Sequence, residues 1–216
     1  MRPLAIAALV VGAAGTGAAA YLVYQHGAQL ATSPPAPTAA ESQSLRLAGQ
    51  IPEIHLADRD GKMRTLADWH GKSLIVNFWA TWCAPCRREI PLLGSLQEQY
   101  GPEGFQVIGI AADYRDKVIA CADEAKINYP LLIGEQDALD AATAFGVQVV
   151  GFPFTVFSDS QGRIIACHVG ELTQPVAGAI LGAVERVNRG QMSPEDARTE
   201  ISTEISKLKG KTGTRA

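Results

Sequence analysis

The most constraining feature of the chain is an apolar stretch that runs directly into a Cys-x-x-Cys turn. From Ser73 to Trp82 the residues are almost continuously apolar and rich in β-branched and aromatic types. This composition is typical of a strand buried on both faces within a parallel sheet. The turn Cys83-Ala84-Pro85-Cys86 follows at once, and Pro85 falls where the first turn of a helix tolerates proline. We therefore expect a central strand, a tight turn and a helix in succession.

The two cysteines of this turn are predicted to have different surroundings. Cys86 begins the inward stripe of the helix, which continues at a 3.6-residue period through Ile90, Leu93, Gln97 and Tyr100. Cys83 falls at the helix N-terminus, where unpaired N–H groups and the helix dipole favour an anion. Such a position can lower a cysteine pKa from about 8.5 to roughly 3.5–7.5. Cys83 would then attack a disulfide as a thiolate, and Cys86 would resolve the mixed disulfide.

The alternative for a Cys-x-x-Cys pair is half of a zinc site. Structural zinc needs four ligands, which usually come from two such pairs or from a cysteine pair and a histidine pair. The sequence contains no second Cys-x-x-Cys and no His-x₃₋₅-His. Redox chemistry without a metal or other cofactor is therefore the favoured interpretation.

Composition limits the remaining classes. A chain of 216 residues with 47% hydrophobic residues can form one domain with a substantial core, plus extensions. Its net charge of -3 gives no basic surface, so nucleic acid is not an expected partner.

The segment Asn77-Phe78-Trp79-Ala80-Thr81-Trp82-Cys83-Ala84-Pro85-Cys86 resembles the active-site segment of the thioredoxin superfamily. It is most similar to the TlpA/ResA branch of membrane-anchored, extracytoplasmic thiol-disulfide oxidoreductases, and the similarity covers residues 49–190. The resemblance implies an α/β thioredoxin fold, with a central mixed sheet flanked by helices. It also implies an N-terminal β-hairpin and a central insertion of helix, extended segment and helix.

The resemblance also suggests an acid for the second cysteine. Cytosolic thioredoxins carry a buried aspartate at the position of Asn77, so the proton acceptor of Cys86 must lie elsewhere. Glu89 matches a glutamate that members of the ResA group carry just after their second cysteine. Its alternative role is that of a solvated acid in the first helical turn, where it would interact favourably with the dipole.

A second functional segment begins at Gly151. Pro153 matches the cis-proline that faces the Cys-x-x-Cys turn in thioredoxin-like folds, although proline before a strand is usually a strand-start residue. The resemblance places Phe152 beside the disulfide, with its backbone available to an extended substrate. It also assigns substrate contacts to Trp82, Ala84 and Pro85.

The first 24 residues are predicted to be a signal anchor. The run from Leu4 to Tyr24 has 21 residues without a charge, enough to span a bilayer core of roughly 30 Å. Arg2 precedes it and no Lys or Arg follows until Arg46, so we expect the domain outside the cytoplasm. The alternative is a cleaved signal peptide and a soluble periplasmic protein, with a small-residue site at Ala18-Ala19-Ala20.

The rest of the chain divides by composition and pattern. Residues 25–48 form a Pro/Ala/Ser-rich linker, residues 49–190 the thioredoxin-like domain, and residues 191–216 a C-terminal helical extension and polar tail. Within the domain we expect hairpins over 51–66 and 155–169, strands over 105–112 and 129–133, and helices over 116–126, 138–145 and 173–187. A further helix begins near Ser193, and the tail contains Lys207, Lys209, Lys211 and Arg215.

Three further residues have reactive or titratable side chains but belong to no recognised motif. Cys121 and Cys167 are expected to be small buried hydrophobic residues, with a structural disulfide between them as the alternative. His168 lies on the opposite strand face from Cys167, and we expect it to be structural or exposed.

Together, the motif and the resemblance predict a membrane-tethered reductase of protein disulfides, which the resemblance implies is recharged by a membrane electron donor of the CcdA or DsbD type. Its candidate clients are the heme-binding cysteines of apocytochrome c and the copper-site cysteines of an oxidase. One alternative is a copper metallochaperone with His168 as third ligand. The other is a thiol peroxidase, although Thr81-Trp82-Cys83 does not reproduce the Thr-x-x-Cys context of peroxiredoxins.

Overall fold

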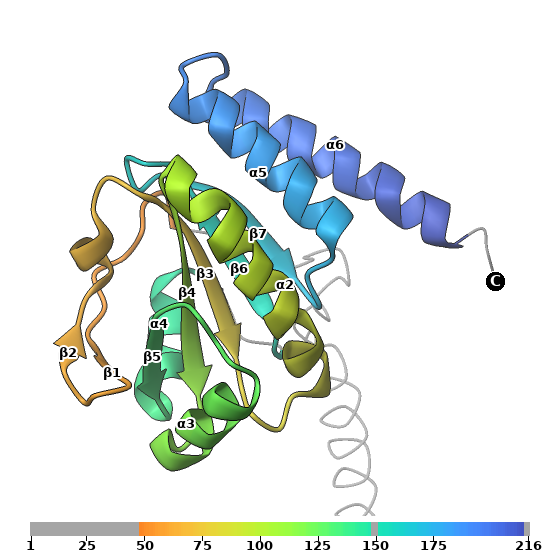
Figure 1. The fold of residues 1–216 in the computed structure, drawn as a ribbon. Coiled ribbons are helices and arrows are strands. Elements are labelled where there is room, and N and C mark those ends of the chain that lie inside the picture. Colours follow the sequence, from red (N-terminus) through yellow and green to blue (C-terminus); the bar gives the residue numbers. More distant parts are fainter. Residues whose placement is uncertain (1–47, 148–150, 214–216) are drawn as a thin grey trace, which may run out of the picture. The chain divides into compact units, whose positions relative to one another are not determined.

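The computed structural model describes residues 48–147 and 151–213, which form a seven-stranded mixed sheet with helices on both faces (Figure 1). The strand order is β2-β1-β5-β4-β3-β6-β7. The strands are β1 (Leu56–Asp58), β2 (Met63–Arg64), β3 (Ser73–Trp79), β4 (Phe105–Ala112), β5 (Leu131–Gly134), β6 (Phe154–Ser158) and β7 (Ile164–Val169). The helices are α2 (Ala84–Tyr100), α3 (Arg115–Glu124), α4 (Gln136–Ala144), α5 (Gln174–Asn188) and α6 (Pro194–Gly213).

Strand β3 lies inside the sheet, as its apolar sequence predicts. It runs parallel to β4 and antiparallel to β6, and all seven of its residues are buried. The strand ends at Trp79, three residues before the apolar run ends, because the following residues leave the sheet for the turn that opens α2. Between Leu74 and Ala80 the one polar residue is Asn77, which lies opposite Gly109 on one side and Thr155 on the other.

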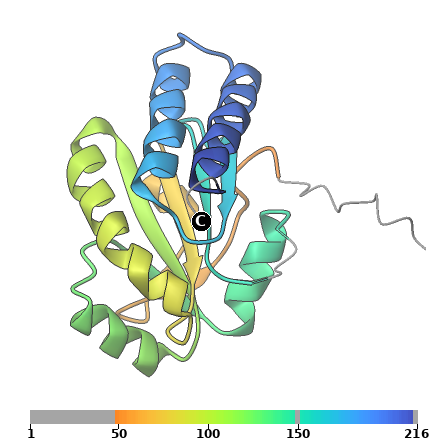
Figure 2. The same ribbon diagram turned by 90° about the vertical axis from the view of Figure 1, so that its right-hand side faces the viewer.

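The two faces of the sheet have separate hydrophobic cores. One core holds residues of α2, α3 and α5 against the face that includes Ile75 and Trp79. The other holds α4 against the face that includes Val76 and Phe78. Figure 2 shows α4 on the opposite side of the sheet from α2 and α3. The alternation along β3 therefore sends Asn77 toward the face that α2 covers.

The predicted hairpins and the central insertion are confirmed. β1 and β2 pair antiparallel, with Gly61 at φ 81° in their turn, and α3, β5 and α4 follow in order. β6 and β7 form the second hairpin, and α5 is the closing helix. The first hairpin is shorter than expected because a 3₁₀ helix, Leu66–Trp69, begins directly after β2.

The C-terminal segment differs from its prediction. A helix does begin after Ser193, whose Oγ accepts a hydrogen bond from the Asp196 N–H at 3.1 Å. The helix then continues to Gly213, so Lys207, Lys209 and Lys211 belong to α6 and not to a polar tail. Burial explains the difference, because Ile201 is part of the core and Ile205 and Leu208 pack against it.

The predicted anchor and most of the predicted linker lie outside the described residues, as does Arg215. Among the residues that the structure describes, no helix combines the length and the apolar character needed to cross a membrane.

Candidate active site

Cys83 and Cys86 form a disulfide at the N-terminus of α2, with their Cα atoms 5.3 Å apart. Cys83 is the N-cap of the helix, and its Sγ accepts a hydrogen bond from the Cys86 N–H at 3.2 Å. Cys83 keeps 5% of its surface exposed, whereas Cys86 is fully buried. The predicted difference between the two cysteines is therefore confirmed.

This arrangement separates two chemical tasks. On reduction, the same helix N-terminus and the Cys86 N–H would stabilise a thiolate at Cys83. Cys86 faces the protein interior, where it can reach Cys83 but not solvent. An incoming disulfide therefore meets Cys83 first, and Cys86 acts only within the protein.

The segments predicted to contact a substrate do lie around the disulfide. Trp82 is 71% exposed, Ala84 is exposed and Pro85 is partly exposed. The Phe152–Pro153 peptide bond is cis, as the resemblance implies. The ring of Phe152 lies 6.1 Å from the ring of Trp82, which brings the cis-proline loop to the Cys-x-x-Cys turn. The part these residues play in binding stays a prediction.

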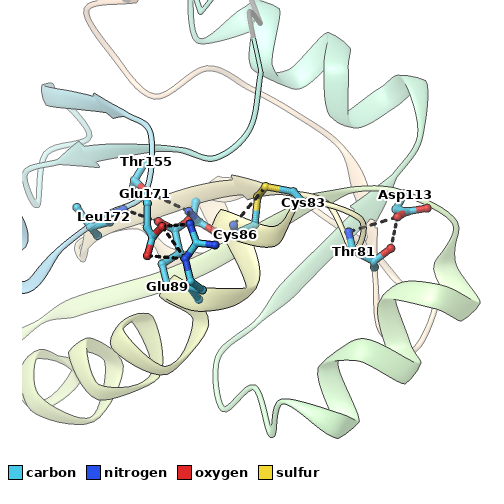
Figure 3. Close-up of a disulfide and its surroundings, with 10 residues drawn as sticks. Thr81, Cys83, Cys86, Glu89, Asp113, Thr155, Glu171 and Leu172 are labelled. Atoms are coloured by element: carbon cyan, nitrogen blue, oxygen red, sulfur yellow. Dashed lines mark hydrogen bonds and ion pairs between the residues drawn. A yellow bond between two sulfur atoms is a disulfide. The ribbon is translucent and has the colours of Figure 1, made fainter.

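Glu89 is buried beneath the disulfide, one helical turn after Cys86 (Figure 3). Only 1% of its surface is exposed, so its interpretation as a solvated acid is wrong. Its Oε1 accepts a hydrogen bond from Asn77 Nδ2 at 2.7 Å, and its Oε2 accepts one from the Leu172 N–H at 2.6 Å. Asn77 thus holds the carboxyl group at a position where cytosolic thioredoxins would carry an acid of their own.

Burial raises the pKa of Glu89 from 4.5 to about 7, although the hydrogen bonds from Leu172 and Asn77 oppose this shift. A carboxyl group with such a pKa exchanges a proton near neutral pH. Residues three positions apart on a helix are neighbours on its surface. Glu89 therefore lies one turn from Cys86, and its role as the proton acceptor of a reduced Cys86 stays a prediction.

A polar row crosses the sheet beneath α2. Asn77 lies opposite Thr155, which lies opposite His168, and Asn77 Nδ2 also donates to Thr155 Oγ1 at 3.0 Å. His168 is buried, its Nε2 lies 3.2 Å from the Glu171 carbonyl oxygen, and burial lowers its pKa. His168 therefore has a structural partner, in line with its prediction.

A second buried carboxylate lies on the other side of the disulfide (Figure 3). Asp113 follows β4 and accepts hydrogen bonds from the Thr81 N–H at 3.3 Å, from the Thr81 hydroxyl and from the Tyr114 N–H at 2.8 Å. Burial opposes its charge, yet these hydrogen bonds hold the pKa of Asp113 below its ordinary value of 3.8. Asp113 is therefore a permanent anion, and its hydrogen bonds fix the turn that carries Trp82 and Cys83.

Sequence reasoning missed Asp113, and it missed an ion pair on the opposite side of the site. Arg88 donates to Glu171 from Nε at 2.9 Å and from Nη2 at 2.5 Å. A polar residue directly after a parallel strand is a signal that could have pointed to Asp113, because ligands and active sites gather at that edge of a sheet. No comparable signal exists for Arg88 and Glu171, which are 83 positions apart.

The remaining thiols are free. Cys121 and Cys167 are each partly exposed and unpaired, so they are less buried than predicted and form no disulfide. Burial raises the pKa of both thiols, that of Cys167 to about 12. In the described part of the chain, no three His, Cys, Asp or Glu side chains gather as metal ligands.

Comparison with known proteins identifies relatives that share this architecture. The chain is 33% identical to the thioredoxin-like protein YneN of Bacillus subtilis (strain 168), over 58% of this chain and 72% of the relative. It is 28% identical to the thiol-disulfide oxidoreductase ResA of Geobacillus thermodenitrificans (strain NG80-2), over 62% and 75%. A solved structure from Chlorobium tepidum, assigned as a thiol:disulfide interchange protein DsbE, superimposes with a TM-score of 0.58 at 25% identity. The overlap covers 65% of this chain and 99% of that one.

These relatives and the site geometry agree. The seven-stranded mixed sheet with its flanking helices is a thioredoxin-like fold, and the protein is a thiol-disulfide oxidoreductase of the ResA/DsbE type with Cys83 and Cys86 as its redox pair. The sequence profile of the AhpC/TSA family matches residues 47–167, more than half of the chain. The chain therefore belongs to the AhpC/TSA family.

Proposed function

We propose that the protein reduces disulfides in extracytoplasmic proteins. The observation that carries the proposal is the buried Glu89 carboxyl group behind Cys86, with a pKa of about 7. A dithiol gives up its electrons only when the buried second cysteine loses its proton, and Glu89 supplies an acceptor for that proton. The similarity to the thiol-disulfide oxidoreductase ResA supports the class of reaction, and the resemblance to the TlpA/ResA branch implies reduction of the client as its direction.

The proposed reaction has two steps. The Cys83 thiolate attacks one sulfur of the client disulfide, a mixed disulfide forms, and the other client sulfur leaves as a thiolate. Cys86 then transfers its proton to Glu89 and attacks the Cys83 sulfur, which forms the Cys83–Cys86 disulfide and releases the second client thiolate. Two electrons pass from the protein to the client, whose two thiolates take up two protons.

The proposed partners follow from this reaction. The substrates are protein disulfides, with the heme-binding cysteines of apocytochrome c and the copper-site cysteines of an oxidase as candidate clients. Each turnover leaves Cys83 and Cys86 oxidised, so a reductant must regenerate them, and the proposed one is a membrane electron donor of the CcdA or DsbD type.

The proposed location is the outer side of the cytoplasmic membrane, with residues 4–24 as an uncleaved anchor. The supporting observation is the run of 21 uncharged residues that follows Arg2. The test is to fractionate cells, wash the membranes with carbonate and determine the mass of the retained chain. A full-length chain in the washed membranes supports the anchor, and a shortened chain in the soluble periplasmic fraction contradicts it.

Trapping of the mixed disulfide tests the proposed reaction directly. The full chain with Cys86→Ala is reduced and mixed with an oxidised peptide that carries a Cys-x-x-Cys-His disulfide. The proposal predicts a stable mixed disulfide through Cys83 in this variant, none in Cys83→Ala, and complete reduction of the peptide by the unmodified chain. An unmodified chain that leaves the peptide oxidised would contradict the proposal.

A further inference from the structure

The loop between β7 and α5 meets α2 at two consecutive residues of each. On α2 these residues are Arg88 and Glu89, and on the loop they are Glu171 and Leu172 (Figure 3). Arg88 binds the Glu171 carboxylate at the surface, with Glu171 34% exposed. Glu89 accepts the Leu172 N–H in the interior at 2.6 Å. The exposed ion pair therefore lies directly beside the buried hydrogen bond.

The same loop is also attached to the substrate side of the site. The Gly170 N–H donates to the carbonyl oxygen of Pro153 at 2.9 Å, and the Glu171 carbonyl oxygen lies 3.2 Å from His168 Nε2. Residues 170–172 thus join the cis-proline loop to the acid behind Cys86. A change in how this loop sits against α2 would alter the hydrogen bond to Glu89.

We propose that Glu171 is a positioning residue: its ion pair with Arg88 holds the Leu172 N–H against the Glu89 carboxylate and so keeps Glu89 able to accept the proton of Cys86. The inference rests on the proposed role of Glu89 and extends it to a residue that touches no reacting atom. A hydrogen bond donated to a carboxylate favours its charged form, so loss of the Leu172 contact makes Glu89 a poorer acceptor at neutral pH.

Direct electrostatics predicts the opposite effect, which makes the inference testable. The negative charge of Glu171 raises the pKa of Glu89, so its removal would by itself lower that pKa. The other titratable groups near Glu89 are Cys86 on its own helix, Tyr129, whose pKa Glu89 raises, and His168 behind Glu171. These groups and the Arg88 guanidinium are all retained when Glu171 is replaced.

The experiment follows each cysteine step separately. The full chain is reduced and mixed with one equivalent of dithiobis(nitrobenzoate), with Cys121→Ala and Cys167→Ala in every protein compared. Attack by Cys83 releases the first coloured thiolate, and attack by Cys86 on the mixed disulfide releases the second. The pH midpoint of the second phase reports the ionisation of Glu89.

The expected result for Glu171→Ala is a second-phase midpoint about one pH unit higher, which means a roughly tenfold lower rate on the acidic side. Arg88→Ala is expected to raise the second-phase midpoint as well. The exchanged pair, Arg88→Glu with Glu171→Arg, is expected to restore the midpoint of the unmodified pair. Glu200→Ala is the matched control, because it removes the two-point Arg186–Glu200 pair, which lies between α5 and α6.

An unchanged or lowered midpoint in Glu171→Ala would overturn the inference, as would a second phase that is insensitive to Glu89→Gln. If Glu171→Ala does not fold, the double variant Arg88→Glu with Glu171→Arg is the deciding test. A second-phase pH midpoint that stays raised in this double variant counts against the inference. The assay is independent of the direction of electron flow in the cell. An oxidising protein would therefore contradict the proposed function while leaving the Glu171 shift in place.

Discussion

Two buried carboxyl groups flank the disulfide, and they have opposite ionisation behaviour. Glu89 and Asp113 are 1% and 8% exposed. Glu89 accepts one hydrogen bond at each oxygen, and burial raises its pKa to about 7. Asp113 accepts three hydrogen bonds from Thr81 and Tyr114, and its pKa is lowered. Asp113 is less deeply buried than Glu89, accepts three hydrogen bonds and lies near the positive charge of Lys117, so the burial that raises the pKa of Glu89 is offset at Asp113. One acid can move a proton at neutral pH, and the other is a fixed anion that holds a loop.

The largest expected effect concerns the proton acceptor. Glu89→Gln keeps the size of the side chain and one acceptor oxygen but cannot accept a proton, and its NH2 group faces one of the two donors, Asn77 Nδ2 or the Leu172 N–H. We expect attack by Cys86 on a mixed disulfide to slow by about 10²-fold or more, with little change in the first attack by Cys83. Stopped-flow measurement of the two phases checks this. Equal slowing of both phases would show that Glu89 does not act on Cys86 in particular.

The second prediction concerns stability and pH in the disulfide-bonded protein. The folded-state pKa of Glu89, about 7, lies above its ordinary value of 4.5. Between these pH values the native state holds a proton that the unfolded state has released, so stability falls as pH rises. The total loss is about 3 kcal/mol. Urea unfolding at pH 4.5, 6 and 8 measures it, and Glu89→Gln should remove this part of the pH dependence.

The third prediction separates Asp113 from Glu89. Asp113→Asn places an amide against the N–H groups of Thr81 and Tyr114, so one donor loses its acceptor. We expect the unfolding free energy at pH 7 to fall by about 2 kcal/mol. The pH midpoint of the Cys86 step should not move, because Asp113 does not titrate in that range. A shift of that midpoint would mean that the two carboxyl groups are coupled and that the comparison fails.

The smallest expected effect concerns one donor to Glu89. Asn77→Ala removes the hydrogen bond at 2.7 Å and should raise the pH midpoint of the Cys86 step by about one unit. Thr155→Val is the matched control, because it removes only the other acceptor of Asn77 Nδ2. An unchanged pH midpoint of the Cys86 step in Asn77→Ala would show that, of the two donors, the Leu172 N–H alone sets the ionisation of Glu89.

Local pattern predicted the parts of the site that are close in sequence. The buried strand, the turn and the helix all follow from the residues between Ser73 and Tyr100, and the resemblance supplied the cis-proline at Pro153. The sequence left the surroundings of Glu89 open, because its two donors lie 12 and 83 positions away. The contacts of Asp113 and Glu171 depend in the same way on the packing of distant loops. The end of α6 was predicted wrongly because the lysine-rich sequence from Lys207 onward is typical of a polar tail, whereas the helix continues to Gly213 and Leu208 packs against the core.

The reduction potential of the Cys83–Cys86 pair tests the central claim most directly. The full chain would be equilibrated in detergent-containing buffers with defined ratios of reduced and oxidised dithiothreitol or glutathione, and the thiols of the pair counted by alkylation and mass spectrometry. If the protein is a reductase that needs a membrane donor, we expect a reduction potential towards the roughly -270 mV of thioredoxin. A value near the roughly -120 mV of DsbA would contradict the reductase and indicate a protein that oxidises its clients.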